Sequence, residues 1–140
     1  MTHTAAQTPP PQVRSLVLVD DSEDLRLLLR MAMERDQEFR VVGEAANGEA
    51  GLAAAIECHP DVLLLDIAMP VMDGLQALPL IREQCPETIV VMLSAFGPKY
   101  GLQHQARLLG AHGYILKGAR MEQVLVELRA ILDGLDGRPA

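Results

Sequence analysis

The chain has 140 residues, of which 49% are hydrophobic and 22% charged, and its net charge is -7. This composition is typical of one globular domain with a hydrophobic core, and it excludes a disordered or fibrous chain. The acidic balance, without clustered lysines and arginines, argues against direct nucleic-acid binding, and the longest apolar runs are too short to span a membrane.

The two ends of the chain differ in composition from its middle. The first twelve residues include Pro9, Pro10 and Pro11, and they lack the basic start and apolar centre of a signal peptide. We therefore expect a disordered tail over residues 1–12, one domain over residues 13–133 and a polar tail over residues 134–140. We also expect the protein to be cytoplasmic.

Short apolar runs predict five buried strands. In chain order they cover residues 16–19, 39–44, 62–65, 89–93 and 114–116. Between them, apolar residues recur at helical spacing. The first helix should follow an N-cap at Ser22, with Arg26 and Arg30 on its outer face. Its inward residues are expected to be Leu25, Leu28, Leu29, Ala32 and Met33.

The helix predicted over residues 75–84 contains a conflict. Pro79 lies inside it. A proline there removes a backbone hydrogen bond and clashes with the preceding turn, at a cost of about 3 kcal/mol. We expect this helix to be kinked or to have an irregular first turn.

Strict alternation of strands and helices predicts an α/β fold with a parallel sheet and helices on both faces. We expect a single doubly wound five-stranded sheet of strand order 2-1-3-4-5, as in flavodoxin-like folds. No internal repeat and no second domain is evident in the sequence.

Polar residues follow four of the five predicted strands. They are Asp20, Asp21, Asp66, Ser94 and Lys117. The carboxyl ends of parallel strands share one edge of a sheet, where ligands bind, so we expect these side chains to surround one crevice. Each alone could be a helix cap, a turn residue or a solvated terminus. Their conjunction at four strand ends argues against that simpler explanation.

The chemistry of this group of residues points to phosphate. Clustered carboxylates raise one another's pKa values, and a hard cation such as Mg²⁺ removes that repulsion. Beside the cation, Lys117 and Ser94 would bind phosphate oxygens. One of the carboxylates could attack phosphorus and form an aspartyl phosphate.

These residues resemble a family. The matching motifs are Asp20-Asp21, Asp66 with Met69-Pro70 and Asp73-Gly74, Ser94-Ala95, and residues 113–117. In that order they look like the receiver domain of bacterial two-component response regulators, over roughly residues 13–132. Lys117-Gly118-Ala119 is similar to receivers of the nitrate-regulator (NarL/LuxR) type. No DNA-binding domain follows, so we expect a stand-alone receiver or a fragment.

The resemblance implies a role for each site residue. Asp66 would be the phosphoacceptor, and Asp20, Asp21, Asp66 and the backbone carbonyl of Ala68 would bind Mg²⁺. Ser94 and Lys117 would contact the phosphoryl group, and Ser94 and Tyr114 would form the switch.

The resemblance also implies partners. The phosphoryl donor would be a sensor histidine kinase or a phosphotransfer protein. An unknown downstream protein would bind the face formed by the fourth helix, the fifth strand and the last helix, and a homodimer is possible. The protein would be a signalling switch rather than a turnover enzyme.

Two features depart from the common receiver pattern. Gly118 follows Lys117 where many receivers have a proline in a cis peptide. A cis bond before a residue other than proline costs about 3 kcal/mol, so we predict a trans bond. Ala68 and Phe96 are apolar where many relatives carry polar side chains that position attacking water, which predicts slow self-dephosphorylation.

Three other functions are alternatives. A phosphatase of the haloacid dehalogenase type needs a second aspartate two residues after the first, where Ala68 stands. A flavodoxin-like nucleotide binder would need a glycine-rich loop after the first strand. The remaining alternative is a receiver-fold interaction module that is never phosphorylated.

Overall fold

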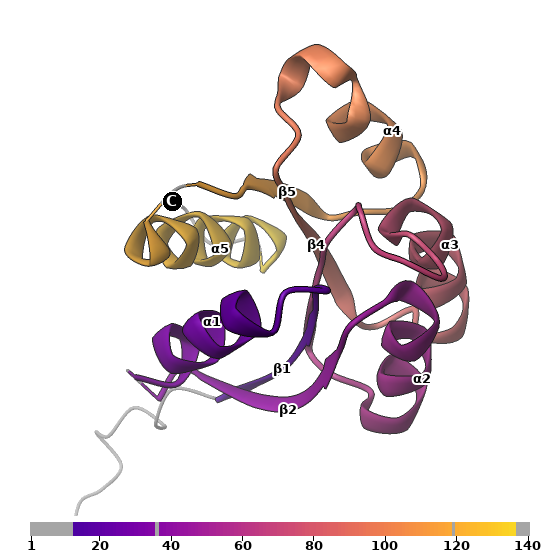
Figure 1. Cartoon of the computed structure of the whole chain (residues 1–140). Helices are drawn as coiled ribbons and strands as arrows, with labels where there is room; N and C mark the ends of the chain where they lie inside the picture. Colours follow the sequence, from indigo (N-terminus) through magenta and orange to yellow (C-terminus); the bar gives the residue numbers. More distant parts are fainter. Residues whose placement is uncertain (1–12, 36, 119, 137–140) are drawn as a thin grey trace, which may run out of the picture.

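The computed structural model describes residues 13–35, 37–118 and 120–136, and strands alternate with helices along this part of the chain (Figure 1). The elements are β1 (Arg14–Val19), α1 (Glu23–Arg35), β2 (Phe39–Ala45), α2 (Gly48–Cys58), β3 (Val62–Leu65), α3 (Gly74–Gln84), β4 (Ile89–Ser94), the 3-10 turn η1 (Pro98–Tyr100), α4 (Leu102–Leu108), β5 (Gly113–Leu116) and α5 (Met121–Leu135). Among the described helices, none is long and apolar enough to cross a membrane.

The sheet confirms the predicted fold. All its strand pairs are parallel, and the order is β2-β1-β3-β4-β5. Helices α1 and α5 cover one face, and α2, α3 and α4 cover the other (Figure 1). The doubly wound arrangement follows from right-handed crossovers between parallel strands.

The central strand β3 is buried on both faces, as its unbroken apolar run predicts. Val62 and Leu64 pack in the core beneath α1 and α5, whereas Leu63 and Leu65 pack in the core beneath α2, α3 and α4. All four side chains are at most 2% exposed. Asp66 follows directly, so its backbone continues from a strand that is buried and paired on both sides.

The first helix begins as predicted but buries a narrower stripe. The Ser22 hydroxyl accepts a hydrogen bond from the Leu25 N–H at 3.1 Å, which caps the helix. Leu29 and Met33 are buried, but Leu28 is 52% exposed, so its predicted inward position was wrong. Leu28 lies at the edge of the apolar stripe, farthest around the helix from Met33.

The proline in α3 does not disturb the first turn. Asp73 accepts a hydrogen bond from the Gln76 N–H at 2.8 Å, and Gln76 Oε1 accepts one from the Asp73 N–H at 3.0 Å. This capping box gives a regular first turn, which excludes one of the two predicted alternatives and leaves a kink at Pro79 as the other. The helix continues through Pro79 while Leu78 and Ile81 are fully buried, and this burial offsets the cost of the proline.

The ends of the domain are close to the prediction. Helix α5 extends to Leu135, so two residues of the predicted C-terminal tail are helical. Leu128 and Leu132 anchor α5 to the core, and the helix continues for less than one turn beyond Leu132 without another buried residue. The predicted tail over residues 1–12 and the last four residues lie outside the described part of the chain. No cis peptide bond occurs among the described residues, which confirms the trans prediction for Lys117-Gly118.

Candidate functional site

The site lies at the carboxyl edge of the sheet, where backbone hydrogen bonds continue past the ends of the strands. The Asp20 N–H donates to the Ala45 carbonyl at 3.0 Å, and the Asp66 N–H donates to the Val19 carbonyl at 2.9 Å. The Lys117 N–H donates to the Ser94 carbonyl at 2.7 Å. The sheet therefore fixes the backbone of Asp20, Asp66 and Lys117.

Three carboxylates meet at this edge, as the sequence predicts. One oxygen each of Asp20, Asp21 and Asp66 lies within 4.8 Å of the others. Asp20 and Asp66 are 3% and 4% exposed, whereas Asp21 is open to solvent. Two buried carboxylates beside an exposed one form an oxygen-rich pocket with an open side, which suits a hydrated Mg²⁺.

Lys117 lies against the two buried carboxylates. Its Nζ is 2.6 Å from Asp20 Oδ2 and 3.1 Å from Asp66 Oδ2. Asp20 Oδ2 is buried, and the Lys117 ammonium 2.6 Å away offsets part of its charge. A carboxylate oxygen has more lone pairs than one ammonium uses, and three clustered carboxylates outnumber Lys117, so the residues present fit the predicted ion.

The pKa values of the site reflect this crowding. Burial raises the pKa of Asp66, the Asp20 charge raises it further, and Lys117 only partly opposes the two. Burial alone would lower the pKa of Lys117, but its contacts with Asp20 and Asp66 outweigh burial and raise that pKa. Without a cation, the site therefore holds more negative charge than one lysine offsets.

The loop after β3 folds back onto Asp66. The Gly74 N–H donates to the Ile67 carbonyl at 2.7 Å. A Cβ at Gly74 would lie 1.9 Å from the Asp66 carbonyl oxygen, so only glycine fits there. Ala68 lies in the same loop, two residues after Asp66, with an exposed side chain.

The predicted switch residues both bond to the backbone of Phe96. Ser94 is fully buried at the end of β4, and its hydroxyl accepts a hydrogen bond from the Phe96 N–H at 3.1 Å. The Tyr114 hydroxyl donates to the Phe96 carbonyl at 2.7 Å. The Phe96 and Tyr100 rings pack edge to face, with ring centroids 5.6 Å apart. One residue of the β4–α4 loop thus joins Ser94 to Tyr114.

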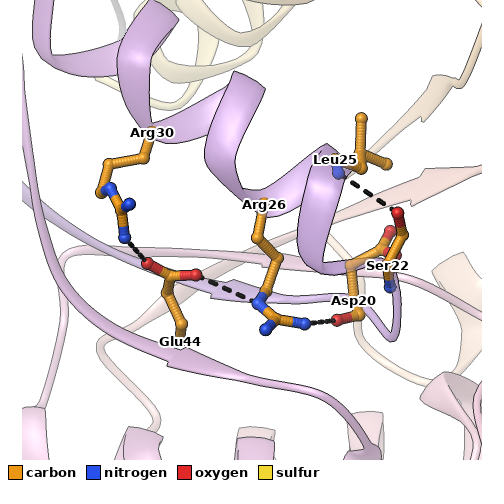
Figure 2. A network of polar contacts seen from close by, with 6 residues as sticks. All are labelled: Asp20, Ser22, Leu25, Arg26, Arg30 and Glu44. Carbon is orange, nitrogen blue, oxygen red and sulfur yellow. Dashed lines mark hydrogen bonds and ion pairs between the residues drawn. The ribbon is translucent and has the colours of Figure 1, made fainter.

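Arg26 was not predicted to take part in the site. Sequence spacing places it on the outer face of the first helix, yet its guanidinium donates to the Asp20 backbone carbonyl at 2.6 Å (Figure 2). It also contacts Glu44 at 3.0 Å. The one signal in the sequence is an acidic residue near the end of the second strand, which is too common to single out a partner.

Comparison with known proteins agrees with this geometry. A family model described as the response regulator receiver domain matches residues 16–129. The chain is 38% identical over 113 residues to chemotaxis protein CheY from Listeria monocytogenes, covering 81% of this chain and 93% of that protein. It spans 23% to 56% of the length of the first three curated relatives that it matches.

Solved structures give the same result. The signal receiver domain of the putative response regulator NarL from Mycobacterium tuberculosis superposes with a TM-score of 0.80 at 34% identity, covering 91% of this chain and 100% of that one. The CheX-CheY-BeF3-Mg complex from Borrelia burgdorferi matches with a TM-score of 0.79 at 28% identity, covering 85% of this chain and 89% of that one.

Proposed function

This chain belongs to the response regulator receiver domain family, and we propose that it is a signalling switch that accepts a phosphoryl group on Asp66. The observation that carries the proposal is the buried position of Asp66 beside two other carboxylates and in contact with the Lys117 ammonium. A carboxylate is a poor nucleophile in water, and an enclosed site that holds charge in place makes it an effective one.

The proposed reaction is a group transfer to this carboxylate. An Asp66 oxygen attacks phosphorus, an acyl phosphate O–P bond forms, and the bond from phosphorus to the donor nitrogen of a phosphohistidine breaks. The imidazole nitrogen leaves with the electron pair of that bond and takes a proton from solvent. Lys117 is within reach of the Asp66 carboxylate and would bind a phosphoryl oxygen after transfer.

Mg²⁺ would supply positive charge that draws phosphate oxygens toward Asp66 and neutralises charge during transfer. Asp20, Asp21, Asp66 and the Ala68 carbonyl are the groups that would hold it. In support, oxygens of Asp20, Asp21 and Asp66 lie within 4.8 Å of one another, and Lys117 contacts two of these three carboxylates. The Borrelia CheY complex, which contains Mg²⁺, is a precedent within the same family.

The proposed response passes through Phe96. A phosphoryl oxygen would attract the Ser94 hydroxyl, which now accepts from the Phe96 N–H. Loss of that bond frees the β4–α4 loop, and Tyr114 is bonded to the same residue. The partner surface would then be formed by α4, β5 and α5, where Leu108, Leu116 and Val126 are exposed apolar side chains.

The phosphorylated state should be long-lived. Ala68 and Phe96 flank the site with apolar side chains that cannot orient an attacking water. We therefore expect slow self-dephosphorylation, and loss of the phosphoryl group within seconds would contradict this.

The test is the intact mass of the protein after incubation with acetyl phosphate, with and without Mg²⁺. We expect a gain of one phosphoryl group in the wild type only when Mg²⁺ is present, and no gain in Asp66→Asn. Asp24→Asn makes the same chemical change at an exposed residue outside the cluster, so it should behave as the wild type.

A negative result would change the proposed function. If the wild type gains no mass from acetyl phosphate or from a phosphohistidine donor, the receiver fold would act as an interaction module without phosphorylation. A gain that persists in Asp66→Asn would assign the phosphoacceptor to another residue.

A further inference from the structure

The backbone carbonyl of Asp20 is held by a side chain from α1. Arg26 Nη1 donates to this carbonyl at 2.6 Å, while Arg26 Nε donates to Glu44 Oε1 at 3.0 Å (Figure 2). Glu44 belongs to β2, where it lies opposite Leu18 of β1. Arg30, one turn further along α1, contacts the other Glu44 oxygen. A network of three charged side chains thus connects α1 and β2 to the end of β1.

The inner part of this network is shielded from solvent. The Arg26 side chain is 15% exposed and that of Glu44 is 24% exposed, whereas that of Arg30 is 41% exposed. Ion pairs at exposed positions are weak because water and salt screen them, and shielding strengthens them. Arg26 is therefore held in one position by Glu44, and Arg30 acts from the solvent side.

The carbonyl that Arg26 holds belongs to the peptide unit between Asp20 and Asp21. A peptide unit is planar, so holding its oxygen sets the orientation of the whole unit and the positions of the Cα atoms of Asp20 and Asp21. The Asp20 carboxylate has its own contacts, with the Ser22 N–H at 2.9 Å and with Lys117. Asp21 is exposed, and no hydrogen bond or ion pair to its side chain occurs within the described residues. Its direction therefore depends on the backbone.

We infer that Arg26 is a positioning residue for the cation site, held in place by Glu44. By fixing the Asp20-Asp21 peptide unit, it directs the Asp21 carboxylate toward Asp20 and Asp66 before a cation binds. The inference rests on the proposed function, because it concerns the Mg²⁺ site that phosphorylation of Asp66 would use.

Charge alone predicts the opposite effect, which makes the inference testable. A guanidinium near three carboxylates weakens their attraction for a cation, so removing its charge should tighten Mg²⁺ binding. Loss of positioning should weaken Mg²⁺ binding. Arg26→Gln and Arg30→Gln remove the same charge from neighbouring turns of α1, but only Arg26 touches the Asp20 carbonyl.

The experiment is a calorimetric titration of the full chain with Mg²⁺, for the wild type, Arg26→Gln and Arg30→Gln. We expect Arg26→Gln to lower Mg²⁺ affinity about tenfold, as seen when groups that orient metal ligands are removed. Arg30→Gln should leave the affinity unchanged or slightly raised. In acetyl phosphate labelling, Arg26→Gln should raise the half-saturating Mg²⁺ concentration and leave the rate at saturating Mg²⁺ unchanged.

A second readout needs no cation. The Ser22 N–H bonds to Asp20 Oδ1 within the same turn, so its hydrogen exchange in the metal-free protein reports on the order of this turn. Exchange should be faster in Arg26→Gln than in Arg30→Gln at matched global stability. A merely structural role for Arg26 would lower stability without this local difference.

Equal Mg²⁺ affinity in the two variants would overturn the inference while leaving the proposed function intact. A wild type that does not bind Mg²⁺ would overturn the proposed function instead. If Arg26→Gln does not fold, Arg26→Lys and Arg30→Lys replace the pair, because an ammonium keeps the charge but cannot reach the carbonyl and Glu44 together. Unchanged Mg²⁺ affinity in Arg26→Lys would then overturn the inference.

Discussion

The two sides of the site are held by different kinds of interaction. On the cation side, which comprises Asp20, Asp21, Arg26 and Glu44, a shielded ion pair ties α1 to β2, and a hydrogen bond from Arg26 ties α1 to the backbone just after β1. On the switch side, which comprises Ser94, Phe96 and Tyr114, two uncharged hydrogen bonds meet on one loop residue.

The helices that follow these two sides differ in the same way. Helix α1 buries Leu29 and Met33 in the core over 13 residues, whereas α4 has seven residues and buries only Ala106. Segments with few buried contacts open most easily. In the proposed function, a site that is firmly held on the cation side and loosely held on the switch side could change shape without losing its cation.

Asp66 lies between the two sides, and the largest expected effect comes from the loop behind it. Gly74→Ala would place a methyl group 1.9 Å from the Asp66 carbonyl oxygen, so the loop must move. We expect a loss of about 3 kcal/mol in the free energy of unfolding, measured with urea, together with loss of phosphorylation. Gly134→Ala is the control, since open space surrounds that position, and it should not destabilise the protein. Equal effects of the two variants would mean that the loop is not packed as described.

Removing Lys117 should leave uncompensated negative charge on the cation side and leave the switch side unchanged. In Lys117→Met, the buried carboxylates of Asp20 and Asp66 lose their shared ammonium. We expect a loss of about 2 kcal/mol in the free energy of unfolding without Mg²⁺. Mg²⁺ should stabilise this variant more than the wild type, as measured by the shift in melting temperature. Adding Asp20→Asn to the same variant should recover part of the loss, and no recovery would contradict the charge explanation.

Tyr114→Phe tests whether the switch side can be loosened alone. The change removes the hydroxyl that donates to the Phe96 carbonyl at 2.7 Å but keeps the ring. We expect a loss of about 1 kcal/mol in stability, and faster hydrogen exchange over residues 97–102. Mg²⁺ affinity should equal that of the wild type. A fall in Mg²⁺ affinity in Tyr114→Phe would show that the cation side and the switch side are coupled before phosphorylation.

The smallest expected effect is a pH dependence that comes from Asp66. Its pKa is raised on folding, chiefly by burial and then by Asp20, so the folded protein binds this proton more tightly than the unfolded chain. Its contribution to stability is therefore full below the unfolded pKa and is lost as the pH rises through the folded pKa. Without Mg²⁺, Asp66→Asn should gain stability relative to the wild type as the pH rises from 4 to 7. Urea unfolding at each pH measures this difference, and a constant difference would contradict it.

Most of the fold could be predicted because its signals are local. The run from Val62 to Leu65 is too short and too apolar for anything but a buried strand, and Asp66 at its end marks the edge of the sheet. The same logic predicts that Asp20, Asp21 and Lys117 meet at this edge, and the structure confirms it. Alternation of strands and helices then left few possible topologies.

The contacts that the sequence did not predict are made by long side chains or by backbone N–H and carbonyl groups. Helical spacing assigns Arg26 to the outer face, but long side chains on a helix lean toward its N-terminus, and this one reaches the Asp20 carbonyl. Leu28 was misplaced because spacing does not give the width of the surface that a helix packs against. The two bonds of Phe96 use its N–H and carbonyl, which leave no trace in the sequence.

The position of Phe96 has a consequence for how the protein can vary. Every amino acid except proline offers the N–H and the carbonyl that link Ser94 to Tyr114, so the link does not depend on which side chain stands at residue 96. In the proposed function, the side chain of residue 96 could then set how readily water reaches the phosphoryl group. The lifetime of the phosphorylated state and the link from Ser94 to Tyr114 would be changed by separate mutations, so related domains with the same link could lose the phosphoryl group at very different rates.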